Sequence, residues 1–152
     1  MVPLNLPVCE LRLKNSENKQ WVYDILRKKF ILLTPEEWVR QHVIHLLKNH
    51  YGYSLSLMAV EKKIEVNGTP KRFDLVVFNN KGSIFLAVEC KAPDVPVTQE
   101  VFDQIARYNM TLQATYLMVT NGLQHYFCQM DYERQQYRFL KDLPKKIRLS
   151  TP

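Results

Sequence analysis

The residues best suited to chemistry close the most apolar run of the chain. The stretch "GSIFLAV" has the composition of a buried strand, and it continues directly into Glu89, Cys90 and Lys91. Charged groups are costly to bury unless they are paired or bound to something. Because residues i and i+2 of a strand lie on one face, we expect Glu89 and Lys91 on one side of the sheet and Cys90 on the other. The stretch "AVECKAP" therefore predicts a charged site at the end of a strand.

A second carboxylate stands on the preceding predicted strand, "RFDLVVF". A loop of two or four residues at "NNKG" would pair Asp74 with Ala87. Asp74 and Glu89 would then lie on one face as diagonal neighbours, about 7–8 Å apart. Two such carboxylates can hold one magnesium ion, whose oxygen ligands sit at about 2.0–2.1 Å. The cation would activate water and neutralise phosphate, and Lys91 would stabilise developing charge. An incidental surface salt bridge is the plain alternative.

The composition is that of one globular domain. The chain has 152 residues, of which 46% are hydrophobic and 24% are charged, and we treat residues 1–152 as a single domain. It has no apolar run of about 18 residues and no secretory signal, so no membrane segment is expected. Three scattered cysteines, Cys9, Cys90 and Cys128, fit neither a disulfide framework nor a CxxC metal site. This pattern favours a reducing, cytoplasmic location.

The positive charge of the chain indicates a polyanionic partner. The formal net charge is +6 and the isoelectric point is about 9.2. Clustered lysines and arginines displace the counterions that condense on a phosphate backbone, and so they favour binding to nucleic acid. Basic doublets occur at Lys28–Lys29, Lys62–Lys63, Lys71–Arg72 and Lys145–Lys146. An ordinary basic protein without such a partner is the alternative.

The order of the predicted elements is that of a mixed α/β fold. A strand is expected over residues 21–33, followed by a helix that begins at the N-cap Thr34, with Pro35 at N1 and Glu37 closing a capping box. Gly52 ends that helix. Further strands are expected over 55–66, 72–78 and 83–91, a second helix capped by Thr98 over 99–113, a strand over 114–120, and a hairpin of 124–132 with 135–140. This order predicts a mixed β-sheet flanked by α-helices.

Several motifs together resemble a known family. Asp74 with Glu89-Cys90-Lys91 resembles the signature of the PD-(D/E)xK nuclease superfamily. The stretches "LTPEEWVRQ", "KRFDLVVF", "AVECKAP" and "FDQIARYN" are similar to the N-terminal nuclease domain of type I restriction enzyme motor subunits. The resemblance covers roughly residues 21 to 123. It implies a restriction-endonuclease-like fold.

The resemblance also implies roles for particular residues. Asp74 and Glu89 match the metal-binding acids, and Lys91 matches the catalytic lysine. Cys90 stands at the variable position and would offer the metal its backbone carbonyl rather than its thiol. The implied cofactor is Mg²⁺, with Mn²⁺ as a substitute.

The two predicted helices carry further candidate site residues. Gln104 and Tyr108 match a Q-x-x-x-Y element, and they stand on a predicted stripe with Val101, Ile105 and Leu112, so Gln104 is expected to face inward. The glutamine would then contact DNA or the active site. The first-helix acid of the superfamily corresponds to Glu37, with Glu36 as the alternative, although the capping box explains Glu37 equally well. Arg40, Gln41, Lys71 and Arg72 are candidates for contact with DNA phosphates, and a solvated helix face accounts for the first pair equally well.

Two departures from the family limit the functional prediction. Phe73 stands where the superfamily name has proline, a position that tolerates replacement. The chain also has no GxxxxGK[ST] motif, so no ATP-driven motor is expected and separate motor or specificity subunits become candidate partners. We therefore expect a magnesium-dependent DNA endonuclease linked to restriction or DNA processing. The alternatives are a DNA-binding module of the same fold, a structure-specific nuclease such as a dimeric junction resolvase, and an unrelated basic protein with a chance Glu-x-Lys.

Overall fold

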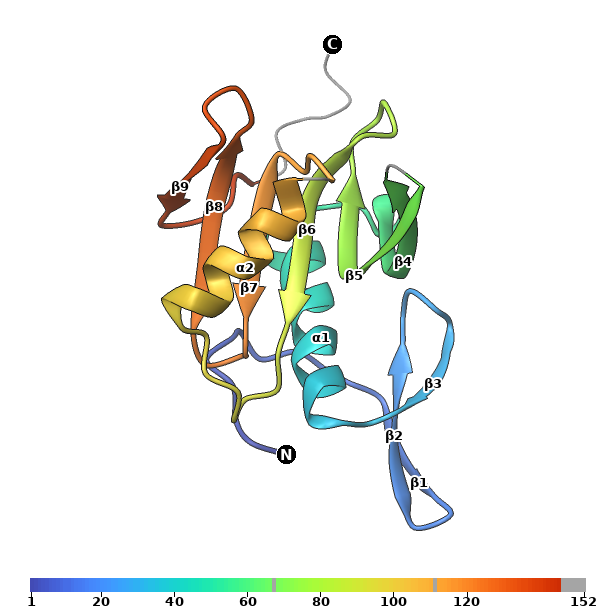
Figure 1. Cartoon of the computed structure of the whole chain (residues 1–152). Helices are drawn as coiled ribbons and strands as arrows, with labels where there is room; N and C mark the ends of the chain where they lie inside the picture. Colours follow the sequence, from blue (N-terminus) through green and yellow to red (C-terminus); the bar gives the residue numbers. More distant parts are fainter. Residues whose placement is uncertain (67, 111, 146–152) are drawn as a thin grey trace.

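The described part of the chain forms two β-sheets and two α-helices, with a π-helical turn over Leu46–His50 and a short 3₁₀ helix over Leu55–Leu57 (Figure 1). The computed structural model describes residues 1–66, 68–110 and 112–145, and it describes residues 62–64, 66 and 69–71 by their backbone alone. The three-stranded sheet has the order β1-β2-β3, and the six-stranded sheet has the order β4-β5-β6-β7-β8-β9. The strands are β1 (Leu13–Ser16), β2 (Lys19–Asp24), β3 (Lys29–Leu32), β4 (Met58–Val66), β5 (Thr69–Phe78), β6 (Ile84–Cys90), β7 (Tyr116–Thr120), β8 (His125–Asp131) and β9 (Gln136–Leu140); the helices are α1 (Pro35–His45) and α2 (Gln99–Met110).

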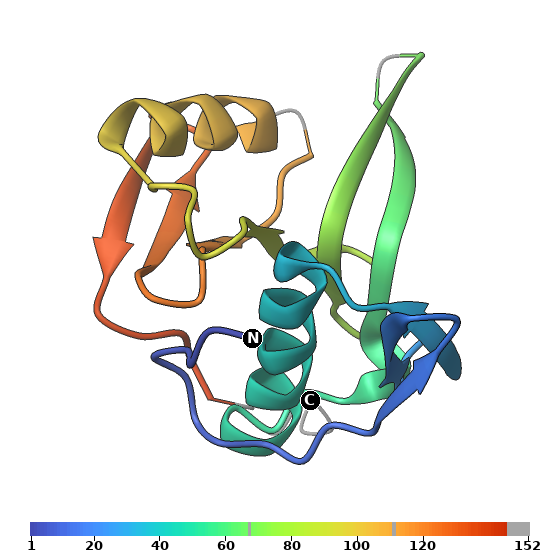
Figure 2. The same cartoon turned by 90° about the horizontal axis from the view of Figure 1, so that it is seen from below.

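Helices α1 and α2 lie on opposite sides of the six-stranded sheet (Figure 2), and each covers an apolar core. Val39, Val43 and Ile44 of α1 pack against one face, and Phe102 and Ala106 of α2 pack against the other. Strands β6 and β7 run parallel because α2 connects them, while the other neighbouring pairs are antiparallel. The mixed α/β class predicted from the sequence is thus confirmed.

Helix α1 begins where its sequence signals predict. The backbone N–H of Glu37 donates to the Thr34 hydroxyl at 3.0 Å, and Pro35 occupies the first turn. The carboxylate of Glu37 turns toward neighbouring cationic and amide groups instead of back to the cap. After His45 the helix widens into a π-helical turn over Leu46–His50, and Gly52 then adopts a φ of 75°, which only glycine takes up without strain.

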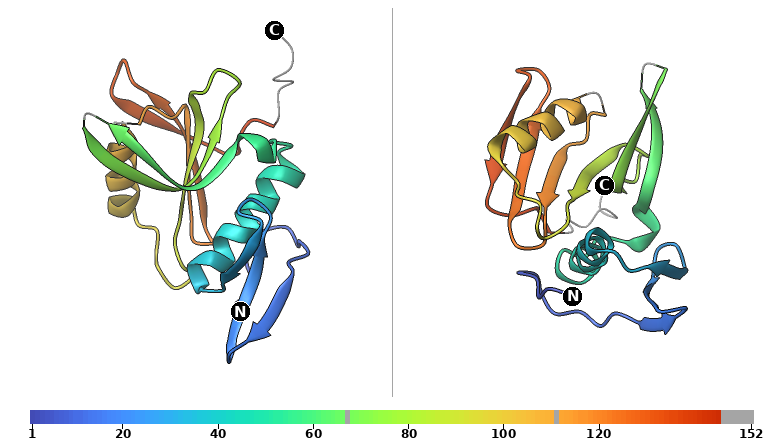
Figure 3. Two further views of the ribbon diagram at one scale, coloured as in Figure 1. Left: turned by 90° about the vertical axis from the view of Figure 1, so that its right-hand side faces the viewer. Right: turned by 60° about the horizontal axis from the view of Figure 1, so that its bottom comes forward.

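The single strand expected over residues 21–33 is in fact two strands, which was a wrong prediction. Asp24 creates the break, because its side-chain Oδ1 accepts bonds from the backbone N–H groups of Leu26 at 2.7 Å and Arg27 at 3.0 Å. Lys28 completes the turn at a φ of 56°. The sequence also gave no signal for β1, which pairs antiparallel with β2. The resulting meander of β1–β3 forms a separate sheet that lies beside α1 (Figure 3), and Arg27 in its second turn lies 3.9 Å from Glu61 of β4.

The pairing of β5 with β6 also differs from the predicted register. Ala87 pairs with Val76, whereas the prediction paired it with Asp74. The turn itself is closed by Asn79, whose backbone N–H donates to the Ser83 carbonyl at 2.9 Å, and a bulge then shifts the register between Val77 and Phe78. Continuing the shifted register by one residue places Asp74 directly opposite Glu89, on one face of the sheet, rather than diagonally.

The cysteines remain as free thiols, with Cys90 and Cys128 buried. Within the part of the chain that the structure describes, no helix has the length and apolar character needed to cross a membrane.

Candidate active site

Asp74 and Cys90 mark the point where β5 and β6 cease to pair through their backbones. The backbone N–H of Cys90 donates to Asp74 Oδ2 at 2.8 Å, while the next N–H, that of Lys91, donates across the other edge of β6 to Thr120 at 2.8 Å. The N–H and C=O of one strand residue point to the same side. The Cys90 carbonyl therefore also points toward the β5 side, where Asp74 lies. The Cys90 side chain packs among the apolar residues under α1, on the face opposite Glu89, as its position in the strand predicts.

Glu89 is a largely buried acid beside a second acid. Its burial, together with the charge of Asp74 and a hydrogen bond shared with it, raises the pKa of Glu89 to about 8, although Lys91 opposes this effect. A proton on Glu89, or a bound cation, relieves the repulsion between its carboxylate and the charge of Asp74. Their oxygens and the Cys90 carbonyl are hard donors of the kind that magnesium prefers. The residues present therefore fit a magnesium ion.

The described residues supply only part of a full coordination shell. No three His, Cys, Asp or Glu side chains among them gather in an arrangement that could hold a metal ion. Asp74 and Glu89 would provide two side-chain ligands, and further ligands would have to be backbone oxygen, water or substrate. Magnesium sites commonly have this make-up, because the ion keeps several waters and binds few carboxylates.

The two neighbouring acids of α1 take different positions. Glu37 is 4% exposed, and its carboxylate accepts bonds from Arg27 at 2.9 Å, Arg40 at 2.6 Å and Gln41 at 2.9 Å. Glu36 is 47% exposed at its side chain. Partial burial and the charge of Asp74 raise the pKa of Glu36, while Arg40 and Lys91 lower it. Glu36, which the sequence left as the alternative, thus lies within electrostatic reach of Asp74 and Lys91.

Arg40 lies in the interior rather than on a solvated helix face. It is 5% exposed, its Nη1 bonds to Glu37, and its Nη2 lies 3.2 Å from both Asp74 Oδ1 and Glu36 Oε1. The expectation that Arg40 and Gln41 contact DNA phosphates does not fit these positions, because Gln41 is fully buried against Asp24 and Glu37. A periodic pattern could not reveal the whole of this environment, since Asp74 beside Arg40 and Asp24 beside Gln41 come from distant segments.

A continuous series of ion pairs links the N-terminal meander to this site. Asp24 holds Arg27 at 2.6 Å, Arg27 holds Glu37 at 2.9 Å, Glu37 holds Arg40 at 2.6 Å, and Arg40 holds Asp74 at 3.2 Å. The Arg27 guanidinium and two backbone N–H bonds lower the pKa of Asp24 against the effect of its burial. We call Asp24, Arg27, Glu37, Arg40 and Asp74 the ion-pair series. Nothing in the local sequence signalled Asp24 or Arg27 as part of the site.

Helix α2 presents a different face from the one predicted. Its buried residues are Phe102, Ala106 and Asn109, and Gln104 is exposed, so the expectation that Gln104 faces inward is wrong. The large ring of Phe102 sets this orientation by packing against Tyr137 and Phe139. Asn109 was missed: it is 0% exposed, and its side-chain oxygen and nitrogen have no hydrogen-bond partner among the described residues.

Tyr108 contacts the strand that carries Asp74. Its hydroxyl accepts the backbone N–H of Arg72 at 2.9 Å, and its ring packs against Phe73 with the centroids 5.3 Å apart. Tyr108 therefore positions β5 just before Asp74. The Arg72 side chain is 59% exposed and forms an ion pair with Glu61 at 3.1 Å. The side chain of Lys71, another candidate for DNA contact, lies outside the described residues.

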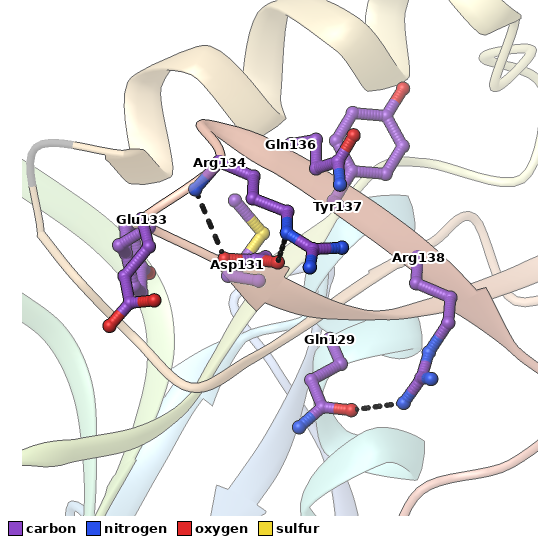
Figure 4. Close-up of a pocket in the computed structure, with 9 residues that line it drawn as sticks. Gln129, Asp131, Glu133, Arg134, Gln136, Tyr137 and Arg138 are labelled. Atoms are coloured by element: carbon purple, nitrogen blue, oxygen red, sulfur yellow. Dashed lines mark hydrogen bonds and ion pairs between the residues drawn. The ribbon is translucent and has the colours of Figure 1, made fainter.

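A surface hollow near the β8–β9 hairpin lies apart from these groups (Figure 4). Arg138 donates to Gln129 at 2.6 Å there, and Arg134 lies 3.9 Å from Asp131. Neither Asp74, Glu89 nor Lys91 lines this hollow. It has no acid pair or lysine arranged like those at the end of β6, so we assign it no chemistry.

Two comparisons relate the chain to known proteins. Residues 35–144 match the family described as type I restriction enzyme R protein N terminus. The fold resembles a fragment structure described as an HsdR subunit of a type I restriction enzyme from Vibrio vulnificus YJ016, with 21% sequence identity and a TM-score of 0.50. The similarity covers 74% of this chain and 24% of that one, so the chain spans about a quarter of that structure. No curated protein matches in sequence.

The family match takes in α1, the whole six-stranded sheet and α2, and with them Asp74, Glu89 and Lys91. It covers well over half of the chain. The chain therefore belongs to the family of the type I restriction enzyme R protein N terminus.

Proposed function

We propose that this chain is a magnesium-dependent DNA endonuclease that hydrolyses phosphodiester bonds, with Mn²⁺ able to replace Mg²⁺. The observation that carries the proposal is the pair formed by Asp74 and Glu89, in which the pKa of Glu89 is raised to about 8 beside a second acid. A bound divalent cation would offset both causes of that raised pKa, the burial of Glu89 and the charge of Asp74, because it stabilises both carboxylates in their charged form. Strongly perturbed acids at one site are typical of catalytic centres.

Each residue has a proposed task. Asp74 and Glu89 would hold the metal with their carboxylates, and the Cys90 carbonyl would complete the protein's share of the ligands. When bound, magnesium supplies Lewis-acid chemistry and activates water. Lys91, whose charge already acts on Glu89 and Glu36, would stabilise negative charge that develops on the phosphoryl oxygens. Arg40 would have to release or share Asp74 Oδ1.

The partners proposed from family membership are DNA and separate motor or specificity subunits of a restriction system. A second candidate function is a DNA-binding module of the same fold without cleavage. It is favoured by the contact of Arg40 with Asp74 Oδ1, because that guanidinium already neutralises one of the proposed metal ligands. The basic net charge of +6 suits both functions.

One assay separates the two candidates. The purified protein is incubated with linear, supercoiled, branched and single-stranded DNA, with Mg²⁺, with Mn²⁺ and with neither. We expect metal-dependent cleavage that is lost in Asp74→Ala and retained in the matched surface variant Glu133→Ala. DNA binding without cleavage under either cation would favour the binding module. Cleavage that persists without a divalent cation, or in Asp74→Ala, would refute the metal site.

A further inference from the structure

The outer face of the N-terminal meander carries aromatic and basic side chains together. Antiparallel pairing places Lys14, Trp21 and Leu32 side by side, and Tyr23 beside Phe30. Arg12 joins them, since its guanidinium lies 4.8 Å from the centre of the Tyr23 ring and 5.5 Å from that of Phe30. We call this set the basic–aromatic face: Arg12, Lys14, Trp21, Tyr23, Phe30 and Leu32.

The opposite face of the same meander attaches it to the rest of the protein. Val22 and Asp24 alternate with Trp21 and Tyr23 along β2, and both are fully buried. Asp24 accepts a bond from Gln41 of α1 at 3.0 Å. The basic–aromatic face is therefore turned away from α1, and its three rings remain partly exposed while Arg12, Lys14 and Leu32 are exposed.

The charges on this face select the kind of partner. None of the β1–β3 residues on it is acidic, and Lys14 Nζ lies 4.2 Å from the centre of the Phe30 ring. Contact between two copies of the face about a two-fold axis would bring like charges together, which opposes self-association. Rings interleaved with cations suit a strand whose bases offer π-faces and whose phosphates offer negative charge.

We propose that the basic–aromatic face binds single-stranded DNA, with Trp21 as its principal stacking platform. Trp21 stands at the centre of the sheet between Lys14 and Leu32, and its Nε1–H is already bonded to the Ser16 carbonyl at 3.2 Å, which fixes the ring. Arg12 and Lys14 would contact the phosphates or the bases. Bases of a duplex are stacked on each other and cannot reach such a platform. The choice of DNA over RNA rests on the proposed function, whereas the stacking surface does not.

The test measures binding of a labelled dT oligomer of about 12 nucleotides by fluorescence anisotropy, using wild-type protein in EDTA so that no cleavage occurs. We expect Trp21→Ala to weaken binding about tenfold or more, and Trp21→Phe to keep most of the affinity. Binding should also quench the emission of Trp21 in wild type, and Trp21→Phe should lose that quenching. The other tryptophan, Trp38, lies on α1, where its indole N–H donates to the Val2 carbonyl, and it is not part of the basic–aromatic face.

Two matched charge-reversal variants show whether a loss of affinity comes from this face, from misfolding or from the lower net charge of the protein. Arg12→Glu with Lys14→Glu changes exposed residues only, and Lys81→Glu with Lys141→Glu makes the same change in net charge elsewhere on the surface. We expect a loss of tenfold or more for the first pair and a loss of less than about threefold for the second. The proposal would be overturned if both double variants lost the same affinity for the dT oligomer. It would also be overturned if the wild type bound duplex DNA or an rU oligomer more tightly than dT, or if it self-associated without binding dT. Because the test excludes metal, a protein that binds dT and cleaves nothing would refute only the nuclease function.

Discussion

The guanidinium of Arg40 lies 3.2 Å from Asp74 and bonds Glu37 at 2.6 Å, so one buried cation joins helix α1 to the strand that carries the candidate metal ligand. Buried ion pairs contribute little relative to apolar replacements, but removal of one partner leaves the other charge without compensation. Arg40 is therefore placed to affect both the stability of the fold and access of a cation to Asp74.

We expect Arg40→Ala to lower the free energy of unfolding by about 3–5 kcal/mol, because Glu37 and Asp74 would lose a buried partner. Urea denaturation measures this quantity. Arg138→Ala serves as the control, since it removes an exposed arginine that bonds only Gln129 among the contacts seen here, and it should change stability by less than about 0.5 kcal/mol. Similar small changes in both variants would show that the ion-pair series contributes little.

The raised pKa of Glu89 predicts a particular dependence of stability on pH. Glu89 binds its proton more tightly in the folded state, up to a pKa of about 8, than in the unfolded chain, where the ordinary value is near 4.5. Its contribution to stability is therefore fully present below pH 4.5 and is lost as pH rises toward 8. The slope is at most about 1.4 kcal/mol per pH unit.

Urea denaturation in EDTA at several pH values checks this dependence. We expect the wild type to lose stability between pH 5 and 8. Glu89→Gln should remove this loss of stability, whereas Glu133→Gln, which changes an exposed residue, should retain it. Magnesium should restore stability to wild type near pH 8, where it competes with the last protons on Glu89. A wild type whose pH profile matches that of Glu89→Gln would contradict the buried acid pair.

Lys91→Ala should separate metal binding from turnover. Both proposed acidic ligands, Asp74 and Glu89, remain in this variant, so calorimetric titration should show that magnesium still binds. Cleavage of plasmid DNA should fall by about 10²–10³, the typical effect of removing one electrostatic stabiliser. Asp74→Ala should lose both properties. Undiminished cleavage in Lys91→Ala would remove Lys91 from the mechanism.

The neighbouring acids of α1 should respond in opposite ways to the same substitution. Glu36→Gln changes a half-exposed side chain near Asp74 and Lys91, so it should weaken magnesium binding while leaving the unfolding free energy nearly unchanged. Glu37→Gln removes the charge that holds Arg27 and Arg40, and should lower stability by more than about 1 kcal/mol. Parallel calorimetry and urea denaturation test this contrast. If Glu37→Gln weakened magnesium binding and Glu36→Gln did not, Glu37 would be the better candidate for the metal site.

Local signals predicted a large part of the fold. Thr34 and Thr98 cap their helices as expected, with bonds of 3.0 and 3.2 Å to backbone N–H groups, because capping depends on residues a few positions away. The alternation of β6 likewise predicted that Cys90 and Glu89 lie on opposite faces. These features need no knowledge of distant contacts.

The missed features depend on tertiary packing or on strand register. The orientation of α2 follows from the cluster around Phe102 in the β8–β9 region, so Gln104 ends in solvent. The environment of Arg40 depends on Asp74, which is 34 residues away in sequence. The break at Asp24 was readable in principle, since aspartate often bonds the backbone N–H groups that follow it, but the β-rich run around it masked that signal.

The bulge in the β5–β6 pairing bears on which changes of chain length this protein can accept. Asn79 and Ser83 close a turn with an odd number of residues between them, and the bulge between Val77 and Phe78 shifts the strand register by one further residue. Insertion or deletion of one residue at either place alone would turn Asp74 to the other side of the sheet from Glu89. Compensating changes of one residue at both the turn and the bulge would keep Asp74 and Glu89 on the same side of the sheet. Engineered variants, and relatives that differ in length here, should therefore alter the turn and the bulge together.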